Sequence, residues 1–241
     1  MSAATTSAPH GAGWMLDEIA SAGRENLDAE HVARYDDKED AGAAEEVKLL
    51  RTLGLEHDSV VVDLGAGTGQ FTLAAAPHCR RVVAVDISPL MLDRLRTKVT
   101  FQHLDNVEVV QAGFLTYDQG EEPADILYTR YALHHLPDAW QAIALTKMRR
   151  SLQPGGLLRL WDVVYNFAPE DAEKKLEAWC ATGGDGVAGQ WSRAEFEEHV
   201  RDEHSTFTWL LEVMIDRAGF RIENATYSED GIFARYILRA S

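Results

Sequence analysis

A glycine-rich loop directly after a short β-branched run is the feature that most constrains the fold of this chain. The loop (GAGTG, residues 65–69) follows the run SVVVD at residues 59–63 and precedes Gln70. Glycine lets a backbone turn sharply and approach a ligand closely. In open α/β sheets such a loop lies at the carboxyl end of a strand, where ligands bind. The segment therefore predicts a strand, a ligand-binding turn and a helix beginning near residue 70.

Strand-like and helix-like segments alternate after this loop. Further strands are expected at residues 81–86 (RVVAVD), 107–110, 124–128 and 157–163, and helices at 41–53, 70–76, 89–99 and 139–152. Such alternation favours a parallel sheet covered by helices on both faces. The nearly continuous apolar runs SVVVD and RVVAV suit strands that are buried on both sides.

The pattern changes after residue 165. Helices are expected at 168–180, 192–203 and 207–218, and two last strands at 220–227 and 232–238. The four-residue turn between these strands implies an antiparallel pair. We therefore expect a Rossmann-like α/β fold with a seven-stranded, mostly parallel sheet whose last strand is antiparallel. A helical insertion or lid at about 165–206 would interrupt a single domain, 14–241, preceded by a disordered leader, 1–13.

Bulk properties narrow the class of function and the compartment. The formal net charge of −16 disfavours a nucleic-acid substrate. No apolar run approaches the roughly 20 residues that a membrane span needs, and the first residues do not resemble a secretory signal. The two cysteines, Cys79 and Cys180, form neither a disulfide framework nor a metal-binding pattern. A cytoplasmic protein is expected, acting on neither nucleic acid nor membrane.

Asp86 closes the second expected strand, 17 residues after the last glycine of the loop. A carboxylate at that place can accept hydrogen bonds from both hydroxyls of a ribose. The loop departs from the dinucleotide fingerprint, because Gln70 stands where that pattern needs its third glycine. This departure counts against a nicotinamide-dependent dehydrogenase.

Four segments together resemble the class I S-adenosylmethionine-dependent methyltransferases, in particular the group that includes the ubiquinone and menaquinone methylases. They are the glycine loop behind Asp63, DISPLML at 86–92, ADILYTRYALHHLP at 124–137 and LQPGG at 152–156. The resemblance covers about residues 35–163. It implies S-adenosylmethionine as the cofactor, S-adenosylhomocysteine as the product and no metal.

The resemblance assigns cofactor contacts position by position. Asp63, Gly65, Gly67 and Gly69 would surround the methionine part and the ribose, with Asp86 on the ribose hydroxyls. Ile87 and Met91 would pack near the adenine, Arg130 would present its backbone to the amino-acid end, and Tyr35 would close over the cofactor. Family members commonly carry an acid near the adenine amino group. Gly113 stands at that position here, so adenine recognition is expected to rest on Phe114.

Catalytic candidates follow the fourth and fifth strands. His134 and His135 come after the fourth strand, at the same rim as the glycine loop, and Asp162 ends the fifth. A histidine there suits proton transfer near neutral pH; the alternative is that the pair only shapes the loop. The side chains expected to contact the acceptor are Tyr131, Trp161, Tyr165, His204 and Trp209. His199 and His204 are five apart, which does not match a zinc-binding helix pair.

The expected activity is methyl transfer to the oxygen, nitrogen or carbon of a small molecule. Two alternatives stay open: a catalytically silent cofactor-binding partner protein, and a methyltransferase that acts on proteins. The sequence leaves both monomer and homodimer open.

Overall fold

The computed structural model describes residues 13–22, 28, 32, 42–184 and 191–241. The expected leader lies outside the described residues except for Gly13, and so does Tyr35. No helix within the described ranges is long and apolar enough to cross a membrane.

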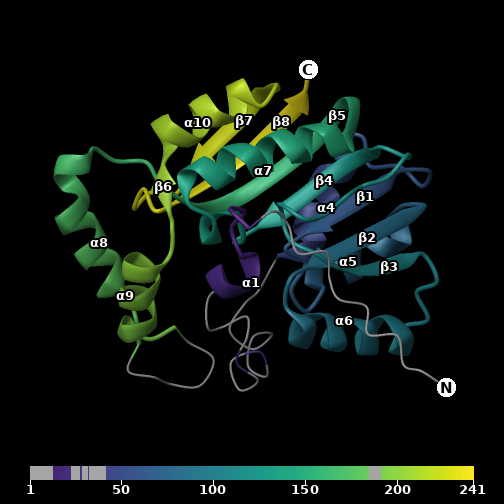
Figure 1. Ribbon diagram of the computed structural model, residues 1–241, viewed down its shortest axis with the longest axis horizontal. Coiled ribbons are helices and arrows are strands. Elements are labelled where there is room, and N and C mark those ends of the chain that lie inside the picture. The colour runs from purple at the N-terminus through teal and green to yellow at the C-terminus, as the bar shows by residue number, and fades with distance from the viewer. Residues whose placement is uncertain (1–12, 23–27, 29–31, 33–41, 185–190) are drawn as a thin grey trace.

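The central sheet confirms the expected fold class. Its strands are β1 (Val60–Leu64), β2 (Arg81–Asp86), β3 (Val107–Gln111), β4 (Ala124–Arg130), β5 (Leu152–Tyr165), β7 (Phe220–Tyr227) and β8 (Phe233–Ala240). They lie in the order β3-β2-β1-β4-β5-β8-β7. The pairs among β1 to β5 are parallel, whereas β8 runs antiparallel to both β5 and β7. The last strand is thus the antiparallel one, inserted between its neighbours (Figure 1).

Helices cover both faces of this sheet. On one face lie α7 (Asp138–Ser151) and α10 (Thr208–Arg217), and on the other α4 (Ala43–Thr52), α5 (Gln70–Ala75) and α6 (Pro89–Phe101). Strand side chains alternate between the two cores. On β1, Val60 and Val62 pack on the α7 side and Val61 on the α4 side. The continuous apolar runs thus reflect burial on both faces.

One boundary differs from the expectation near residue 206. Thr206 and Phe207 form a short strand, β6, parallel to the end of β5, and α10 begins only at Thr208. Phe207 was expected to begin the helix, but it has extended backbone and stands at the N-cap. Its pairing with Tyr165 outweighs the helical spacing of the sequence.

The segment between β5 and β6 carries two further helices, α8 (Ala172–Cys180) and α9 (Arg193–Asp202). They lie together beyond the end of β5 (Figure 1). A capping box starts α9, because Ser192 and Glu195 bond each other's backbone amides. Trp179 is buried and contacts Phe196, with ring centroids 4.9 Å apart. The aromatic residues thus include a small core of this segment's own, continuous with the end of β5.

Candidate functional site

The glycine loop turns from β1 into α5 with left-handed backbone at two glycines that nothing larger could replace. Gly65 has φ +82°, and a Cβ there would lie 2.5 Å from the Cβ of Ala132. Gly69 has φ +86°, and a Cβ there would lie 2.1 Å from Leu95. The first glycine lets the loop pack against the segment after β4, and the last lets α6 pack against α5. Both the turn and its neighbours therefore depend on glycine.

Asp86 lies at the carboxyl end of β2 and holds the loop through the backbone. Its Oδ2 accepts a hydrogen bond from the amide of Gly67 at 2.7 Å, and its Oδ1 accepts one from the amide of Ser88 at 2.8 Å. Burial raises the pKa of its carboxyl group, although both amides oppose the shift. Because each oxygen has further acceptor capacity, the carboxylate can also receive ribose hydroxyls.

Asp63 is more deeply buried than Asp86, with 2% of its surface exposed. It accepts a hydrogen bond from the hydroxyl of Thr72 at 2.5 Å. Burial raises the pKa of Asp63 to about 7, and the negative charge of Asp86 adds to the effect. This carboxyl group fastens β1 to α5.

A pocket opens beside the loop, with about 610 Å³ of empty space including the part that is open to solvent. Most of the expected cofactor residues are on its wall. Its described lining is Glu18, Ala22, Leu64, Gly65, Gly67, Asp86, Ile87, Ala112, Gly113, Phe114, Arg130, Tyr131, Ala132, His135 and Leu136. Asp63, Gly69 and Met91, also expected to contact the cofactor, are buried behind this described wall.

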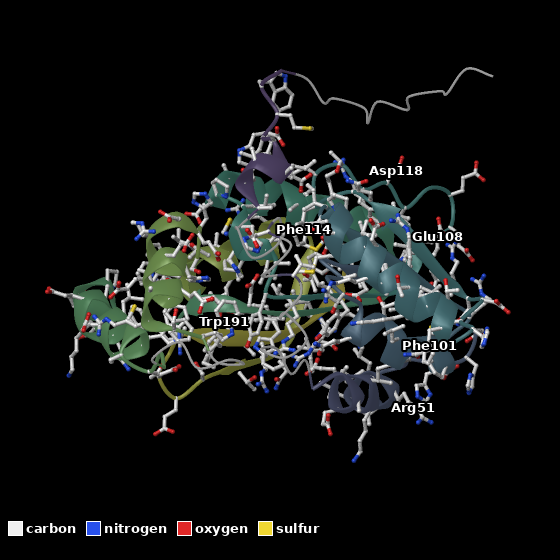
Figure 2. All side chains as sticks on the ribbon, turned by 90° about the horizontal axis from the view of Figure 1, so that it is seen from below. Arg51, Phe101, Glu108, Phe114, Asp118 and Trp191 are labelled. Carbon is white, nitrogen blue, oxygen red and sulfur yellow. The ribbon has the colours of Figure 1, made fainter. Side chains whose placement is uncertain are left out.

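Glu18, on α1 (Glu18–Ser21), is a pocket residue that sequence reasoning missed. Its carboxylate accepts hydrogen bonds from the amide of Leu115 at 3.1 Å and the hydroxyl of Thr116 at 3.3 Å. A Cβ at Gly113 would lie 2.3 Å from Glu18 Oε1. Figure 2 shows Phe114 close to α1. The carboxylate thus occupies the side-chain space of the position where the resemblance implies an acid.

Aromatic and cationic side chains line the edge between β4 and β5. Tyr131 has left-handed backbone with φ 49°, and its ring meets Trp161 edge-on at 5.5 Å. The guanidinium of Arg130 lies 4.2 Å from the Trp161 ring. Tyr131 thus has a backbone conformation that non-glycine residues rarely adopt.

The other three expected acceptor residues lie elsewhere. Tyr165 is buried against Phe167 and Phe207, and Trp209 is 55% exposed and stacks on Phe207. His204 is exposed, although its backbone amide donates to the carbonyl of His134 at 2.8 Å. Of the five expected acceptor residues, only Tyr131 is on the described pocket wall.

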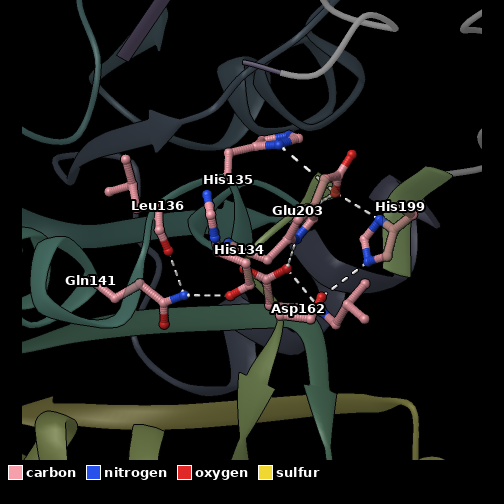
Figure 3. Close-up of polar contacts among 10 residues, drawn as sticks. His134, His135, Leu136, Gln141, Asp162, His199 and Glu203 are labelled. Carbon is pink, nitrogen blue, oxygen red and sulfur yellow. Dashed lines mark hydrogen bonds and ion pairs between the residues drawn. The ribbon is translucent and has the colours of Figure 1, made fainter. Parts of the chain in front are cut away.

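The expected catalytic residues do meet, behind the pocket wall. His134 is buried, and its Nδ1 contacts Asp162 Oδ1 while its backbone amide donates to Asp162 Oδ2 at 3.2 Å. His135 is the member of this group that lines the pocket. Figure 3 shows these side chains gathered beside the carboxyl ends of β4 and β5.

Glu203 and His199 complete this cluster, and the sequence analysis did not identify them. Glu203 Oε2 lies 2.8 Å from His134 Nε2, 2.6 Å from His199 Nδ1 and 3.8 Å from His135 Nδ1. His199 and Glu203 stand four residues apart at the end of α9, the spacing that places side chains on one helix face. This four-residue spacing is the sequence signal from which the pair could have been predicted. His199 and His204, which are five residues apart, do not form a site.

Opposite pKa shifts distinguish the two neighbouring histidines. Burial alone would lower the pKa of His134, but Asp162 and Glu203 outweigh it and raise that pKa to about 10. Burial and the adjacent positive charge of His134 lower the pKa of His135 to about 4. Burial opposes ionisation of Glu203, yet the adjacent imidazoles of His134 and His199 hold its pKa below the usual range. The two neighbouring imidazoles thus differ in their tendency to take up a proton.

Known proteins share both the motif segment and the fold. A family described as methyltransferase domain matches residues 61–156. An uncharacterized methyltransferase of Geobacillus kaustophilus is 26% identical over 69% of this chain and 82% of its own length. A carboxy-S-adenosyl-L-methionine synthase of Pseudomonas fluorescens is 33% identical over 53% of this chain and 55% of its own. The chain thus spans only about half of that second relative.

Among solved structures, the N-methyltransferase NodS of Bradyrhizobium japonicum WM9, in complex with S-adenosyl-L-homocysteine, has a similar fold. Its TM-score is 0.55 at 19% identity, covering 81% of this chain and 86% of NodS. The strand order and the glycine loop are those of a Rossmann-like fold of the type found in methyltransferases. The chain thus contains a segment, 61–156, that matches a methyltransferase domain, within a fold similar to that of NodS.

Proposed function

We propose that this protein transfers a methyl group from S-adenosylmethionine to a small-molecule acceptor in the cytoplasm. One observation carries the proposal: a single pocket wall joins the glycine loop and Asp86 to Tyr131 and His135. The first two suit the cofactor and the last two suit the acceptor.

The pocket residues fit the parts of this cofactor. Asp86 would accept the ribose hydroxyls, while the backbone at Gly65 and Gly67 allows close approach of the methionine part. Ile87 and Phe114 supply apolar surface for the adenine. We assign the adenine amino group to Glu18, because its carboxylate lies against Gly113. Arg130 remains the proposed backbone contact for the amino-acid end.

The protein's own contribution is alignment of the acceptor and exclusion of water. When bound, S-adenosylmethionine supplies an electrophilic methyl group with a neutral thioether leaving group. Tyr131 and Trp161 would orient the acceptor at the β4–β5 edge. His135 is placed to accept a proton from an acceptor hydroxyl or amine, since it lines the pocket. His134 and Asp162 would act behind it, by fixing its position.

A small acceptor is favoured over a macromolecule by the site and by the charge. The pocket is lined by apolar residues with few convergent polar groups, as small-molecule sites usually are. The net charge of −16 opposes a polyanionic substrate. A protein substrate and a silent cofactor-binding role remain the alternatives that the experiment must separate.

Calorimetric titration with S-adenosylhomocysteine, with NAD as a parallel control, tests the proposal. We expect micromolar binding of the first and none of the second. Labelled methyl transfer to a small-molecule panel, with bulk protein as a competing acceptor, then separates enzyme from silent binder. Failure to bind S-adenosylhomocysteine would refute the cofactor assignment. Binding without transfer to any acceptor would favour the silent partner, and transfer to protein alone would favour the protein methyltransferase.

A further inference from the structure

Three imidazole nitrogens and one carboxylate oxygen converge where α9 meets the segment after β4 (Figure 3). Donor atoms of His134, His135 and Glu203 all lie within 4.8 Å of one another. His199 adds a further nitrogen, 2.6 Å from the same glutamate oxygen. Imidazole with carboxylate is a donor set that suits divalent transition metals such as Zn²⁺. The residues come from two segments some 65 positions apart, so the fold itself brings them together.

The outer contacts of this cluster resemble those around metal-binding histidines. The far nitrogen of His134, Nδ1, contacts the Asp162 carboxylate, and the far nitrogen of His199, Nε2, lies 3.0 Å from Ser205 Oγ. Metal-binding histidines almost always use the second ring nitrogen in this way, which fixes the ring and its tautomer. Both inward-facing nitrogens, His134 Nε2 and His199 Nδ1, are thereby oriented toward Glu203.

The positions of the hydrogen atoms in this cluster require a positive charge, either a proton or a metal ion, between His134 Nε2 and Glu203 Oε2. Because a carboxylate only accepts hydrogen bonds, His134 Nδ1 must carry the hydrogen that faces Asp162. In a neutral ring Nε2 then presents a lone pair to Glu203 Oε2 at 2.8 Å, which is repulsive. That oxygen is buried, and although the nitrogens are within ion-pair distance, none of the described groups donates to it with good hydrogen-bond geometry. A proton on His134 or a bound metal ion would resolve the repulsion.

We propose that His134 Nε2, His199 Nδ1 and Glu203 Oε2 bind one divalent transition-metal ion of the Zn²⁺ type. Ligands about 2.0–2.2 Å from a tetrahedral zinc lie roughly 3.3–3.6 Å apart. The observed contacts of 2.6 and 2.8 Å are shorter, so the glutamate would retreat by a fraction of an ångström on binding. The missing good hydrogen bonds to Oε2 favour the metal over a proton alone.

The position of His135 connects this centre with the pocket. His135 Nδ1 lies 3.8 Å from Glu203 Oε2, and the residue lines the pocket. Catalytic zinc sites hold three protein ligands and leave a further position for water or substrate. An oxygen or nitrogen of the acceptor could take that position on the His135 side. This last step rests on the proposed function, whereas metal binding itself does not.

The test is metal binding by the full-length chain, purified without a histidine tag and stripped with a chelator. Calorimetry with Zn²⁺ should give one ion per chain, and Co²⁺ should produce a visible absorption band. Glu203→Gln and His199→Ala should each lower the Zn²⁺ affinity at least 100-fold. Asp162→Asn should lower it about 10- to 100-fold, the usual cost of losing an outer-shell partner. His57→Ala, at an exposed histidine outside the cluster, should not change it.

Equal Zn²⁺ affinity of the native chain and the ligand variants would overturn the inference. So would a native chain that binds no Zn²⁺ and shows His134 as an imidazolium in ¹⁵N spectra at neutral pH. Circular dichroism checks that each variant is folded. If Glu203→Gln does not fold, His199→Ala provides the test instead. S-adenosylhomocysteine affinity, measured on the same samples, reports the proposed function separately.

Discussion

The two sides of the site both bury a carboxyl group, but the pKa values of the two groups shift in opposite directions. On the cofactor side, burial raises the pKa of Asp63 to about 7, and Asp86 nearby adds to the shift. On the acceptor side, the adjacent imidazoles of His134 and His199 overcome burial and hold the pKa of Glu203 below its usual range. The neighbours decide the outcome, because burial alone would raise both pKa values. The same burial thus gives a group that is partly neutral near pH 7 and a group that is ionised.

The difference follows from how each side is built. The cofactor side uses one loop and two strand ends, and its second carboxylate, Asp86, is satisfied by backbone amides at 2.7 and 2.8 Å. The acceptor side uses side chains from η2 (Leu133–His135), β5 and α9, whose charges balance each other. Substitutions should therefore act locally on the first side and spread through the cluster on the second.

Of the variants discussed, Asp63→Asn should have the largest effect. The effect should appear in how the free energy of unfolding depends on pH. The folded pKa, about 7, is above the unfolded value of 3.8, so the stabilising contribution is fully present below the unfolded pKa. This stabilising contribution is lost as pH rises through about 7. At about 1.4 kcal/mol per pKa unit, the loss amounts to up to about 4 kcal/mol. Asparagine stays neutral and can still accept from Thr72. Urea denaturation at about pH 5 and about pH 8 should capture about 3 kcal/mol of this loss, because the rest occurs below pH 5.

The variant should gain stability relative to the native chain as pH rises. Subtracting the stability-against-pH curve of Asp63→Asn from that of the native chain cancels the contribution of every group whose titration the substitution does not change. Asp93→Asn is the matched control, because Asp93 is exposed on α6 and its hydrogen bond is to Arg96. A constant difference between native chain and Asp63→Asn would show that Asp63 is ionised throughout.

Asp86→Ala tests the cofactor side directly. It should weaken S-adenosylhomocysteine binding by a factor of about 150 or more, since two hydrogen bonds to a charged group are lost, each worth about 1.5–3 kcal/mol. Asp86→Asn keeps the shape and one acceptor, so its loss should be smaller. Asp93→Ala removes the same charge from the surface and should bind normally. Unchanged affinity in Asp86→Ala would remove the ribose assignment.

The sequence predicted the parts of the site whose geometry depends on residues close together in the chain. It predicted much less of the parts that depend on contacts between distant segments. The loop at 65–69 and Asp86 could be read because turn geometry and strand order follow from nearby residues. Glu203 could not, because its role depends on α9 meeting His134 after the chain has folded. Asp162 could be placed at a strand end, but its contact with His134 Nδ1 could not. Tertiary contacts between distant segments leave no periodic trace in the sequence.

Glu18 is the exception on the cofactor side, because it reaches the pocket from far along the chain. Its hydrogen bond to the amide of Leu115 spans 97 residues. The sequence showed only that the expected acid was missing at Gly113. The structure shows that another segment fills that space, so the cofactor side also contains one non-local part.

Glu18→Gln should have the smallest effect and the most specific one. Losing one hydrogen bond from the adenine amino group costs about 0.5–1.5 kcal/mol, up to about tenfold in affinity. A cofactor analogue with a carbonyl in place of that amino group provides the matched test. The native chain should prefer the amino form, because a carboxylate only accepts. Glutamine can donate to the carbonyl, so the variant should lose the preference, measured as the ratio of two dissociation constants. If both affinities fall equally in Glu18→Gln, the residue only fastens α1 to the segment after β3, and the adenine would be recognised by Phe114 and the backbone alone.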